Sequence, residues 1–469
     1  MIEINLKNVD KTQIMKYLFY LVMLLTIFIR VIALLNSDNF HGIAAGKVVC
    51  AQSLVKHPNY LESWIIPAHG PVHIYLIALV FKLFNDPLLA PRLISLFAGI
   101  GFVGVYYYFL KQAFDEKIAL ISSFLIALFP LHIIHSILST AEACFLFFLV
   151  CGLFFMERYL KNKQDNCLIY AAILISLASM CRFEGGLFIL FAGIFLLKQP
   201  KKLFLFISIA SILPVIWMIF NYVYGGNFLF FLSASDSIVH TEYDYLRNLG
   251  QSVTFSEKLV YWPGQLAKFF GLPIFIIGLF GLVRGAYAKN KRILFLFLII
   301  ISYFTWKTVK EELAMQPRYG LSLAILFIPF FALAAIELLN KIKGNKRMVI
   351  IAALVLYVLV RGTYLTAISL PKTPIWLVQA GEFLHDNLKE DNAVYIDSEE
   401  DNYKDPLKLQ TNTDIDRFIG KNHFFRHLEL MDPLGRARLK YVVLISQRKM
   451  HNLKQVFNSG DCRIYDVKN

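Results

Sequence analysis

An aspartate stands directly after the first apolar run that is long enough to cross a bilayer. Asp38 follows residues 17–35 and lies in the polar stretch 36–42 (NSDNFHG). A carboxylate at the edge of a membrane span is costly to desolvate, so it often marks a functional site. Its chemistry would be that of a general base, which takes a proton from an attacking hydroxyl group. The alternative is an aspartate that is merely solvated at a helix end.

Further charged side chains are expected at the ends of later spans, on the same side of the membrane. Arginine binds phosphate through two parallel N–H groups, and a neighbouring carboxylate could orient a substrate. Each residue also has a structural explanation, as a partner of the helix dipole, a simple ion pair or a side chain that snorkels to the interface. Their meeting at one face is more informative than any single residue. These residues are Glu142, Arg182, Glu184, Arg318 and Tyr319.

Imidazole and indole groups complete the candidate substrate contacts. His69 and His73 are spaced as on one helix face and could bind zinc, but Pro71 between them disfavours a regular helix. An Asp-x-Asp at 414–416 imitates the metal motif of nucleotide-sugar enzymes, and we interpret it as a solvated turn. A divalent metal is therefore possible but not indicated, and no other cofactor is expected. The candidate contacts are His41, Trp64, His69, His73, His132 and His135.

The composition is that of a membrane protein, with 57% hydrophobic residues and a mean hydropathy of +0.56. Soluble domains carry roughly 45–50% apolar residues, and the excess here forms repeated runs of about 17–23 residues. The first run is not followed by a small-residue cleavage site, so we expect it to stay as an anchor. The net charge of +14 does not indicate a nucleic-acid partner, because the basic residues cluster in short loops between apolar runs.

The apolar runs predict an α-helical polytopic membrane protein with about eleven transmembrane helices. The basic clusters all fall in the cytoplasm, together with the N-terminus, only if the short apolar segment 71–84 lies on the outer surface as a juxtamembrane helix. The expected spans are 17–35, 88–110, 118–137, 141–160, 167–181, 184–197, 203–222, 267–284, 293–309, 318–339 and 348–368.

Two parts of the chain follow from this topology. A membrane domain covers residues 1–370 and carries long outer loops at 36–87 and 222–265. A soluble outer domain covers residues 371–469. We expect this domain to have an α/β fold, because a helix-like segment precedes several strand-like runs. The helix-like segment is 375–388, and the strand-like runs are 393–396, 441–445 and 463–465.

At the residues described above, the chain resembles membrane glycosyltransferases with the GT-C fold, of the glycosyltransferase 39 or protein-mannosyltransferase-like type. The resemblance rests on the order and spacing of several short motifs. It departs from the pattern where Asn39 follows Asp38 in place of glutamate, and where Gly70 precedes Pro71 in place of a second proline. The motifs are Asp38, 70–76 (GPVHIYL), 92–95 (RLIS), 129–132 (FPLH), 140–143 (TAEA), 182–185 (RFEG) and 317–319 (PRY).

The resemblance implies an inverting glycosyltransferase that moves a sugar from a polyprenyl-phosphate donor to an acceptor outside a bacterial inner membrane. The acceptor could be a lipid, a glycan or a protein, and membrane lipid surrounds the enzyme. Asp38 would be the catalytic base and Glu142 would position its partner or the acceptor. The lipid phosphate would be held by Arg318, Tyr319, Arg182 and Glu184.

Two other classes of function use the same charges. In a transporter or lipid flippase they would line a pathway through the membrane. In a scaffold subunit they would have no chemical role. Transporters commonly show internal repeats and compact loops, whereas this chain has long outer loops and no visible repeat. The enzyme is therefore our leading hypothesis, with the sugar, the acceptor and the lipid length left open.

Overall fold

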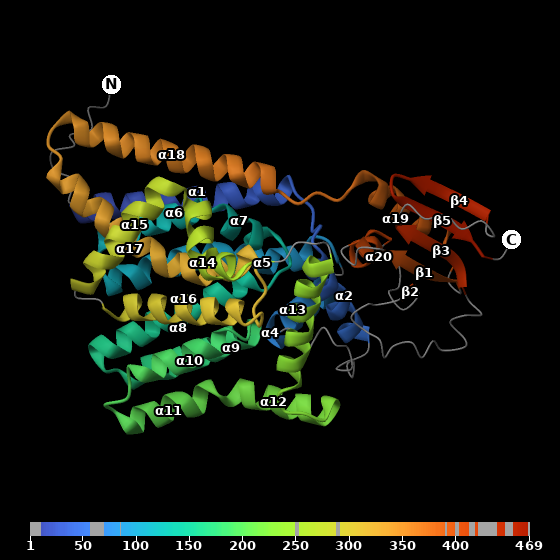
Figure 1. Ribbon diagram of the computed structural model, residues 1–469, viewed down its shortest axis with the longest axis horizontal. Helices are drawn as coiled ribbons and strands as arrows, with labels where there is room; N and C mark the ends of the chain where they lie inside the picture. The colour runs from blue at the N-terminus through green and yellow to red at the C-terminus, as the bar shows by residue number, and fades with distance from the viewer. Residues whose placement is uncertain are drawn as a thin grey trace.

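The chain forms a bundle of long helices that is joined at one end to a small sheet domain (Figure 1). This arrangement confirms the predicted fold class, a helical membrane protein with a C-terminal α/β part. The computed structural model describes residues 11–56, 70–84, 86–248, 253–287, 291–389, 392–398, 403–411, 418–420, 439–445 and 454–467.

Six helices of the described chain are long and apolar enough to span a membrane, and two bent helix pairs bring the number to eight if each pair is one span. The long helices are α1 (Lys11–Leu35), α5 (Ala90–Ala113), α8 (Glu142–Asn162), α16 (Lys291–Val309), α17 (Gly320–Lys341) with the preceding 3-10 turn η2 (Pro317–Tyr319), and α18 (Asn345–Ser369). The pairs are α6 (Glu116–Ala127) with α7 (Pro130–Ile137), and α11 (Pro200–Ala210) with α12 (Ile212–Gly225).

The first pair bends by 62° where α6 ends and α7 begins. Pro130 is the first residue of α7, and Phe129 before it is extended. Proline cannot donate an N–H to the preceding turn and disfavours a helical conformation of its predecessor, so the helix breaks there.

Shorter apolar helices account for the remaining predicted spans. Three of them, α9 (Asp165–Cys181), α10 (Gly185–Ile194) and α15 (Leu272–Tyr287), occupy runs that we expected to cross the membrane. A fourth, α4 (Pro71–Phe84), is the segment that we expected at the outer surface.

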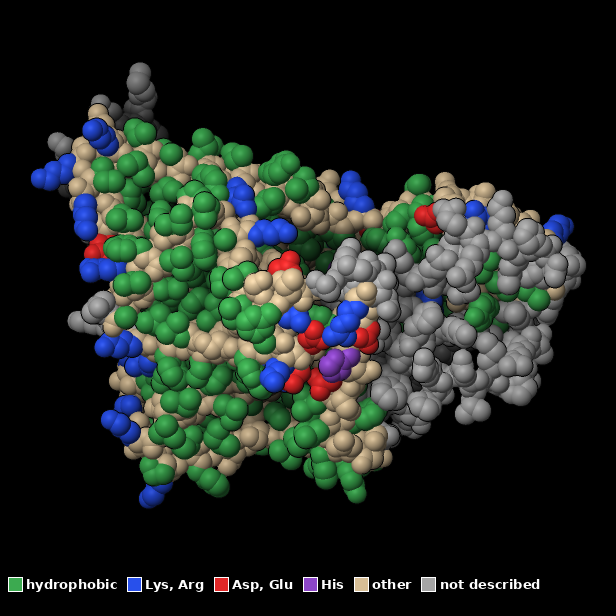
Figure 2. Space-filling model, viewed as in Figure 1, with side chains coloured by type: hydrophobic (Ala, Val, Ile, Leu, Met, Phe, Trp, Pro, Cys, Tyr) green, Lys and Arg blue, Asp and Glu red, His purple; other side chains and the backbone are tan. Residues whose placement is uncertain are grey.

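The two ends of the bundle differ in their charge. At the end away from the sheet domain, Arg292 pairs with Glu157 and Lys202 pairs with Asp165, so the loops that join successive helices lie together there. Figure 2 shows Lys and Arg side chains gathered at this end. The opposite end holds α2 (Gly42–Lys56), α4 and α13 (Phe230–Asn248), beside the sheet domain (Figure 1). Helix α14 (Phe255–Phe270) packs against α16.

The C-terminal part is a five-stranded mixed sheet with two helices packed against it. The strand order is β2-β1-β3-β5-β4, in which β1 is parallel to β2 and β3, and β5 is antiparallel to β3 and β4. Its core includes Leu377, Val394, Val443 and Ile464, and Phe40 from the membrane domain packs against this core. The elements are α19 (Ile375–Asn387), β1 (Ala393–Ser398), α20 (Lys404–Gln410), β2 (Phe418–Gly420), β3 (Leu439–Ile445), β4 (Lys454–Ser459) and β5 (Cys462–Asp466).

The sheet domain is docked on the outer helices. Helix α2 packs against both α4 and α20. Leu409 of α20 joins the apolar cluster formed by Val48 of α2 and Ile74 of α4. These contacts fix the position of α2 at the end of the membrane bundle, next to the candidate site described below.

Candidate active site

Three chain turns at the sheet-domain end of the bundle bring a carboxylate and two arginines together. Glu142 is the first residue of α8, where free helix N–H groups favour a negative charge. Arg182 follows the last residue of α9 in an extended conformation. Arg318 is the middle residue of η2, directly before α17. The predicted spans placed these residues at one face, and the structure brings them into contact.

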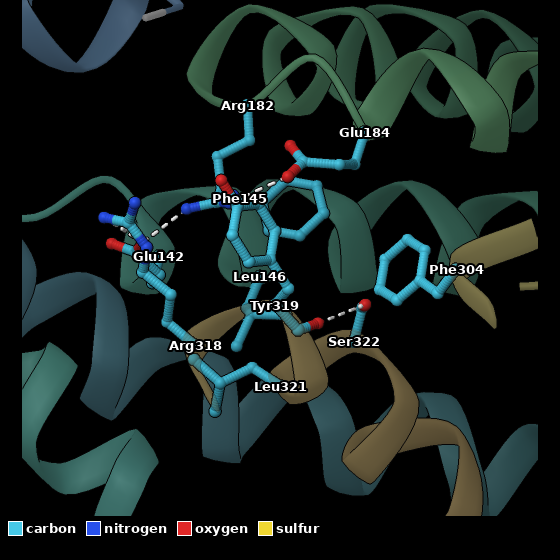
Figure 3. A pocket seen from close by; sticks show the side chains of 10 residues that line it. All are labelled: Glu142, Phe145, Leu146, Arg182, Glu184, Phe304, Arg318, Tyr319, Leu321 and Ser322. Atoms are coloured by element: carbon cyan, nitrogen blue, oxygen red, sulfur yellow. Dashed lines mark hydrogen bonds and ion pairs between the residues drawn. The ribbon is translucent and has the colours of Figure 1, made fainter. Parts of the chain in front are cut away.

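Glu142 is the centre of this junction (Figure 3). Its Oε1 accepts a hydrogen bond from Arg182 Nη1, and Arg318 Nη1 lies 3.8 Å from the same oxygen. Arg182 Nη2 donates to Glu184 Oε1 at 2.8 Å. The Tyr319 ring lies 4.7 Å from the guanidinium carbon of Arg182 and 5.4 Å from that of Arg318. We call Glu142, Arg182, Glu184, Arg318 and Tyr319 the arginine junction.

A tight turn holds Arg182 in place. A Cβ atom on Gly185 would lie 2.6 Å from the backbone of Ser179, closer than any side chain tolerates. A glycine at this position therefore lets α10 start directly against the end of α9. The turn between the two helices carries both Arg182 and Glu184, so the close approach fixes the arginine beside Glu142.

The junction also has a buried cation that the sequence analysis missed. Lys47 of α2 is 3% exposed, and Glu142, Arg182 and Arg318 all act on its charge. Burial lowers the pKa of Lys47 to about 8, and the negative charge of Glu142 opposes this shift. Among the described residues of the junction, three cations thus share the carboxylates of Glu142 and Glu184, which leaves one positive charge in excess. A lysine within the small-residue stretch of α2 is the only sequence signal for it.

A small cavity opens beside the arginine junction (Figure 3). Its polar lining consists of the five junction residues and Ser322. Its apolar lining consists of Phe145, Leu146, Phe304 and Leu321. An anionic group attached to an apolar chain matches such a mixed lining, because the anion can face the guanidinium groups while the chain contacts the apolar side chains.

Three candidate histidines have different neighbours. His135 Nδ1 is 3.6 Å from Glu142 Oε2 and 2.9 Å from the hydroxyl of Thr140. Burial lowers the pKa of His41, and the positive charge of Arg318 adds to that effect. His132 instead hydrogen-bonds to the buried Arg30 at 2.7 Å, where α1 meets the break between α6 and α7.

The other sequence candidates are either away from the cavity lining or outside the described residues. His73 is fully buried within α4. Trp64, His69 and the Asp-x-Asp at 414–416 lie outside the described residues. Among the residues that the structure describes, no group of three or more His, Cys, Asp or Glu side chains is placed to hold a metal ion.

Asp38 lies in a second, more exposed place at the same end of the bundle. Its Oδ2 accepts a hydrogen bond from the backbone N–H of Thr373 at 2.8 Å, and its own N–H donates to the carbonyl of Pro371 at 2.9 Å. Both partners belong to the linker between α18 and the sheet domain. Asp38 does not line the cavity at the arginine junction.

Two neighbours tie the Asp38 segment to the membrane bundle. Asn39 Oδ1 accepts from the backbone N–H of Ser139 at 3.0 Å, three residues before Glu142. Arg92 donates to the carbonyl of Ile137 at 2.7 Å and to the hydroxyl of Ser37 at 2.7 Å. Arg92 belongs to the RLIS motif, but its role in joining the ends of α1 and α7 was not predicted.

Comparisons with known proteins agree with this architecture. The family model of dolichyl-phosphate-mannose-protein mannosyltransferases matches residues 68–223. No curated protein matches the chain by sequence. The crystal structure of apo ArnT from Cupriavidus metallidurans is similar over 97% of this chain and 98% of its own, with a TM-score of 0.66 and 12% identity.

The oligosaccharyltransferase of Archaeoglobus fulgidus shares the same fold. Its apo structure is similar over 92% of this chain and 70% of its own, with a TM-score of 0.64 and 14% identity. A structure tethered with an acceptor peptide is similar over 92% of this chain and 69% of its own, with a TM-score of 0.60 and 12% identity. The chain thus shares the GT-C fold of these proteins, and over residues 68–223 it is similar to the dolichyl-phosphate-mannose-protein mannosyltransferases.

Proposed function

We propose that the protein transfers a sugar from a polyprenyl-phosphate donor to an acceptor hydroxyl group, at the outer face of the membrane. The observation that carries this proposal is the excess positive charge at the arginine junction, where Lys47, Arg182 and Arg318 share two carboxylates. A buried cluster with surplus cation charge is best completed by an anion. The apolar lining of the adjoining cavity fits the lipid that carries such an anion.

The basic loops support the proposed orientation. Lys and Arg side chains gather at the end of the bundle opposite the arginine junction (Figure 2), and cytoplasmic loops carry an excess of Lys and Arg. The junction and the sheet domain would then both face outward. A lipid donor reaches this position laterally through the bilayer, so no soluble activated sugar is needed outside the cell. The lining of the cavity comes from this one end, which favours an enzyme over a transport pathway.

In the proposed reaction the acceptor oxygen bonds to the anomeric carbon while the bond from that carbon to the phosphate oxygen breaks. The acceptor proton passes to Asp38, whose Oδ1 has no hydrogen-bond partner among the described residues. The electron pair of the broken bond leaves with the polyprenyl phosphate. Arg182 and Arg318 stabilise the charge that develops on this leaving group. Glu142 holds the two guanidinium groups next to each other by attracting both of them.

Purified protein in proteoliposomes tests this proposal directly. Polyprenyl-phosphate sugars extracted from the source cells and labelled in the sugar should lose their label to a new product in the presence of the parent protein. A double variant, Arg182→Ala with Arg318→Ala, should leave the donor intact. Movement of the intact labelled donor across the bilayer, with no cleavage of the sugar–phosphate bond, would instead establish a flippase. Mass analysis of glycolipids and glycans from a deletion strain would identify the product.

A further inference from the structure

Lys47 differs from the two arginines in its partners. Arg182 forms ion pairs with Glu142 and Glu184, and Arg318 approaches Glu142. Within the part of the chain that the structure describes, Lys47 forms no hydrogen bond or ion pair, although Glu142 is close enough to act on its charge. A buried ammonium group without a bonded partner is costly, so its retention calls for an explanation.

The packing of α2 leaves very little of Lys47 exposed to water. Long lysine side chains usually extend their ammonium group to the surface. Here the side chain is 3% exposed, and the neighbouring residues Ala44, Ala45 and Val48 are fully buried. Helix α2 is itself held between α4 of the membrane domain and α20 of the sheet domain. Lys47 is therefore held within reach of the charges of Glu142, Arg182 and Arg318 by a helix that is fixed on two sides.

We propose that Lys47 is a direct ligand of the donor phosphate, and that its ammonium group gains its ion-pair partner only when the lipid donor is bound. This inference rests on the proposed function and adds a residue on α2 to the phosphate site. It explains why a lysine is buried at this place without a bonded carboxylate. In the proposal, the bound donor phosphate supplies the negative charge that pairs with the ammonium group of Lys47.

The proposal predicts that donor binding is coupled to a proton. Burial lowers the pKa of Lys47 to about 8, so part of the population is neutral in mildly alkaline solution. The groups that act on it are Glu142, Arg182, Arg318 and the thiol of Cys181, and its charge in turn acts on His41 and the thiol of Cys144. A bound phosphate favours the charged ammonium form, so binding above about pH 8 takes up a proton. The affinity for the donor should consequently fall as the pH rises beyond 8.

Farnesyl phosphate and farnesol are suitable probes, because they differ only in the phosphate group. A phosphate monoester is already a dianion above pH 7.5, since its second pKa is about 6. Binding of both probes to the purified full-length protein should be measured by calorimetry between pH 7.5 and 9.5. The variants are Lys47→Met, which removes the charge at similar length, and Lys47→Arg, which keeps it at every pH. Lys56→Met removes an exposed lysine from the same helix and is the matched control.

We expect the parent protein to prefer farnesyl phosphate to farnesol and to lose part of this preference as the pH rises. Lys47→Met should bind farnesyl phosphate about 10- to 100-fold more weakly, the usual value of one charge-assisted hydrogen bond, with farnesol binding unchanged. Lys47→Arg should show no dependence on pH in this range. Lys56→Met should match the parent. The melting temperature of Lys47→Met should equal or exceed that of the parent, because a desolvated charge has been removed.

The outcomes separate this inference from the proposed function. If the parent protein binds farnesyl phosphate no better than farnesol, the polyprenyl-phosphate donor itself is wrong. If the parent prefers the phosphate and Lys47→Met keeps the same affinity at every pH, only the role of Lys47 is wrong. A lower melting temperature with equal losses for both probes would assign Lys47 to folding and would also overturn the inference.

Discussion

The two acidic residues that the sequence pointed to lie in contrasting surroundings. Glu142 is 1% exposed, begins a membrane helix and is surrounded by the guanidinium groups of Arg182 and Arg318. Asp38 is exposed and is held by the backbone of the linker to the sheet domain. The first carboxylate is bound by fixed cations. The second has no hydrogen-bond partner for its Oδ1 among the described residues, and the charge of Arg92 acts on it from a distance.

Because of this difference, the surroundings of Glu142 suit the binding of an anion, and those of Asp38 suit proton transfer. A carboxylate that is surrounded by cations is a poor proton acceptor, because the negative form is stabilised. The same cations are well placed for an anionic substrate, because their positions are fixed before it arrives. An exposed carboxylate with a free oxygen can accept a proton from a hydroxyl group that enters from solvent. We therefore propose that the donor binds on the Glu142 side and the acceptor on the Asp38 side.

The largest effect is expected from Asp38→Asn. The amide keeps an oxygen for the N–H of Thr373 but cannot take up a proton, so turnover should fall about 10²–10⁴-fold. Donor affinity and melting temperature should not change. Sugar transfer in proteoliposomes measures the turnover. Asp86→Asn is the control, because Asp86 likewise accepts backbone N–H groups, at the start of α5, and has no proposed role. Parental turnover in Asp38→Asn would remove this residue from the mechanism.

Glu142→Gln should act mainly on stability. Loss of the central carboxylate leaves Arg318 and Lys47 without a compensating charge, and breaking a buried ion pair costs about 3–5 kcal/mol. The melting temperature in detergent should therefore drop, while Lys47→Met should not lower it. Glu184→Gln is the control, since Glu184 is more exposed and its loss should cost less. A large fall in turnover at an unchanged melting temperature would contradict this role and would identify Glu142, in place of Asp38, as the base.

The overall fold was predictable because it depends on patterns that are local in the chain. The apolar runs at 167–181 and 184–197 already marked α9 and α10 as shorter than the other spans, and the structure places helices at Asp165–Cys181 and Gly185–Ile194. The strand-like runs at 393–396 and 441–445 likewise fall within β1 and β3.

The site was only partly predictable, because its details depend on contacts between distant segments. The alternation of spans was enough to place Glu142, Arg182 and Arg318 at one face. It could not place Lys47, because the face of α2 that is buried depends on its contacts with α4 and α20. The contact between Asp38 and Thr373 is equally non-local, since it joins the first outer loop to the linker of the last domain.

A smaller effect, on donor use, is expected at Arg318. Arg318→Ala should raise the donor KM about 10- to 100-fold, in line with one charge-assisted hydrogen bond. Arg318→Lys should recover only part of this loss, because an ammonium group cannot make two parallel bonds to phosphate. Kinetics with a synthetic lipid-phosphate sugar provide the measurement. Arg284→Ala is the control, an arginine paired with Glu337 at the opposite end of the bundle. If both Arg318 variants behave like the parent, the side chain only snorkels to the interface.

The smallest effect is expected where the sheet domain holds the Asp38 segment. Phe40 stacks on Tyr403 of the sheet domain, with 5.9 Å between ring centroids, and lies two residues after Asp38. Such an aromatic pair contributes about 0.5–1.5 kcal/mol beyond its buried area. Phe40→Ala should thus loosen the docked arrangement and lower turnover about 2- to 10-fold, the change that this energy corresponds to. The donor KM should stay at the parental value, because the arginine junction is untouched.

Two observations would show whether this docking, and not folding in general, is what supports Asp38. Hydrogen exchange should become faster at Thr373, whose N–H donates to Asp38. It should stay slow in α8, which begins with Glu142, and in α17, which follows the turn that carries Arg318. Phe40→Tyr should restore turnover, because a second aromatic ring can stack on Tyr403, while Phe97→Ala should have no effect, since Phe97 is 69% exposed on α5. If Phe40→Ala accelerates exchange at Thr373 and leaves turnover unchanged, the base does not need the linker, and the exposed carboxylate of Asp38 acts without help from the sheet domain.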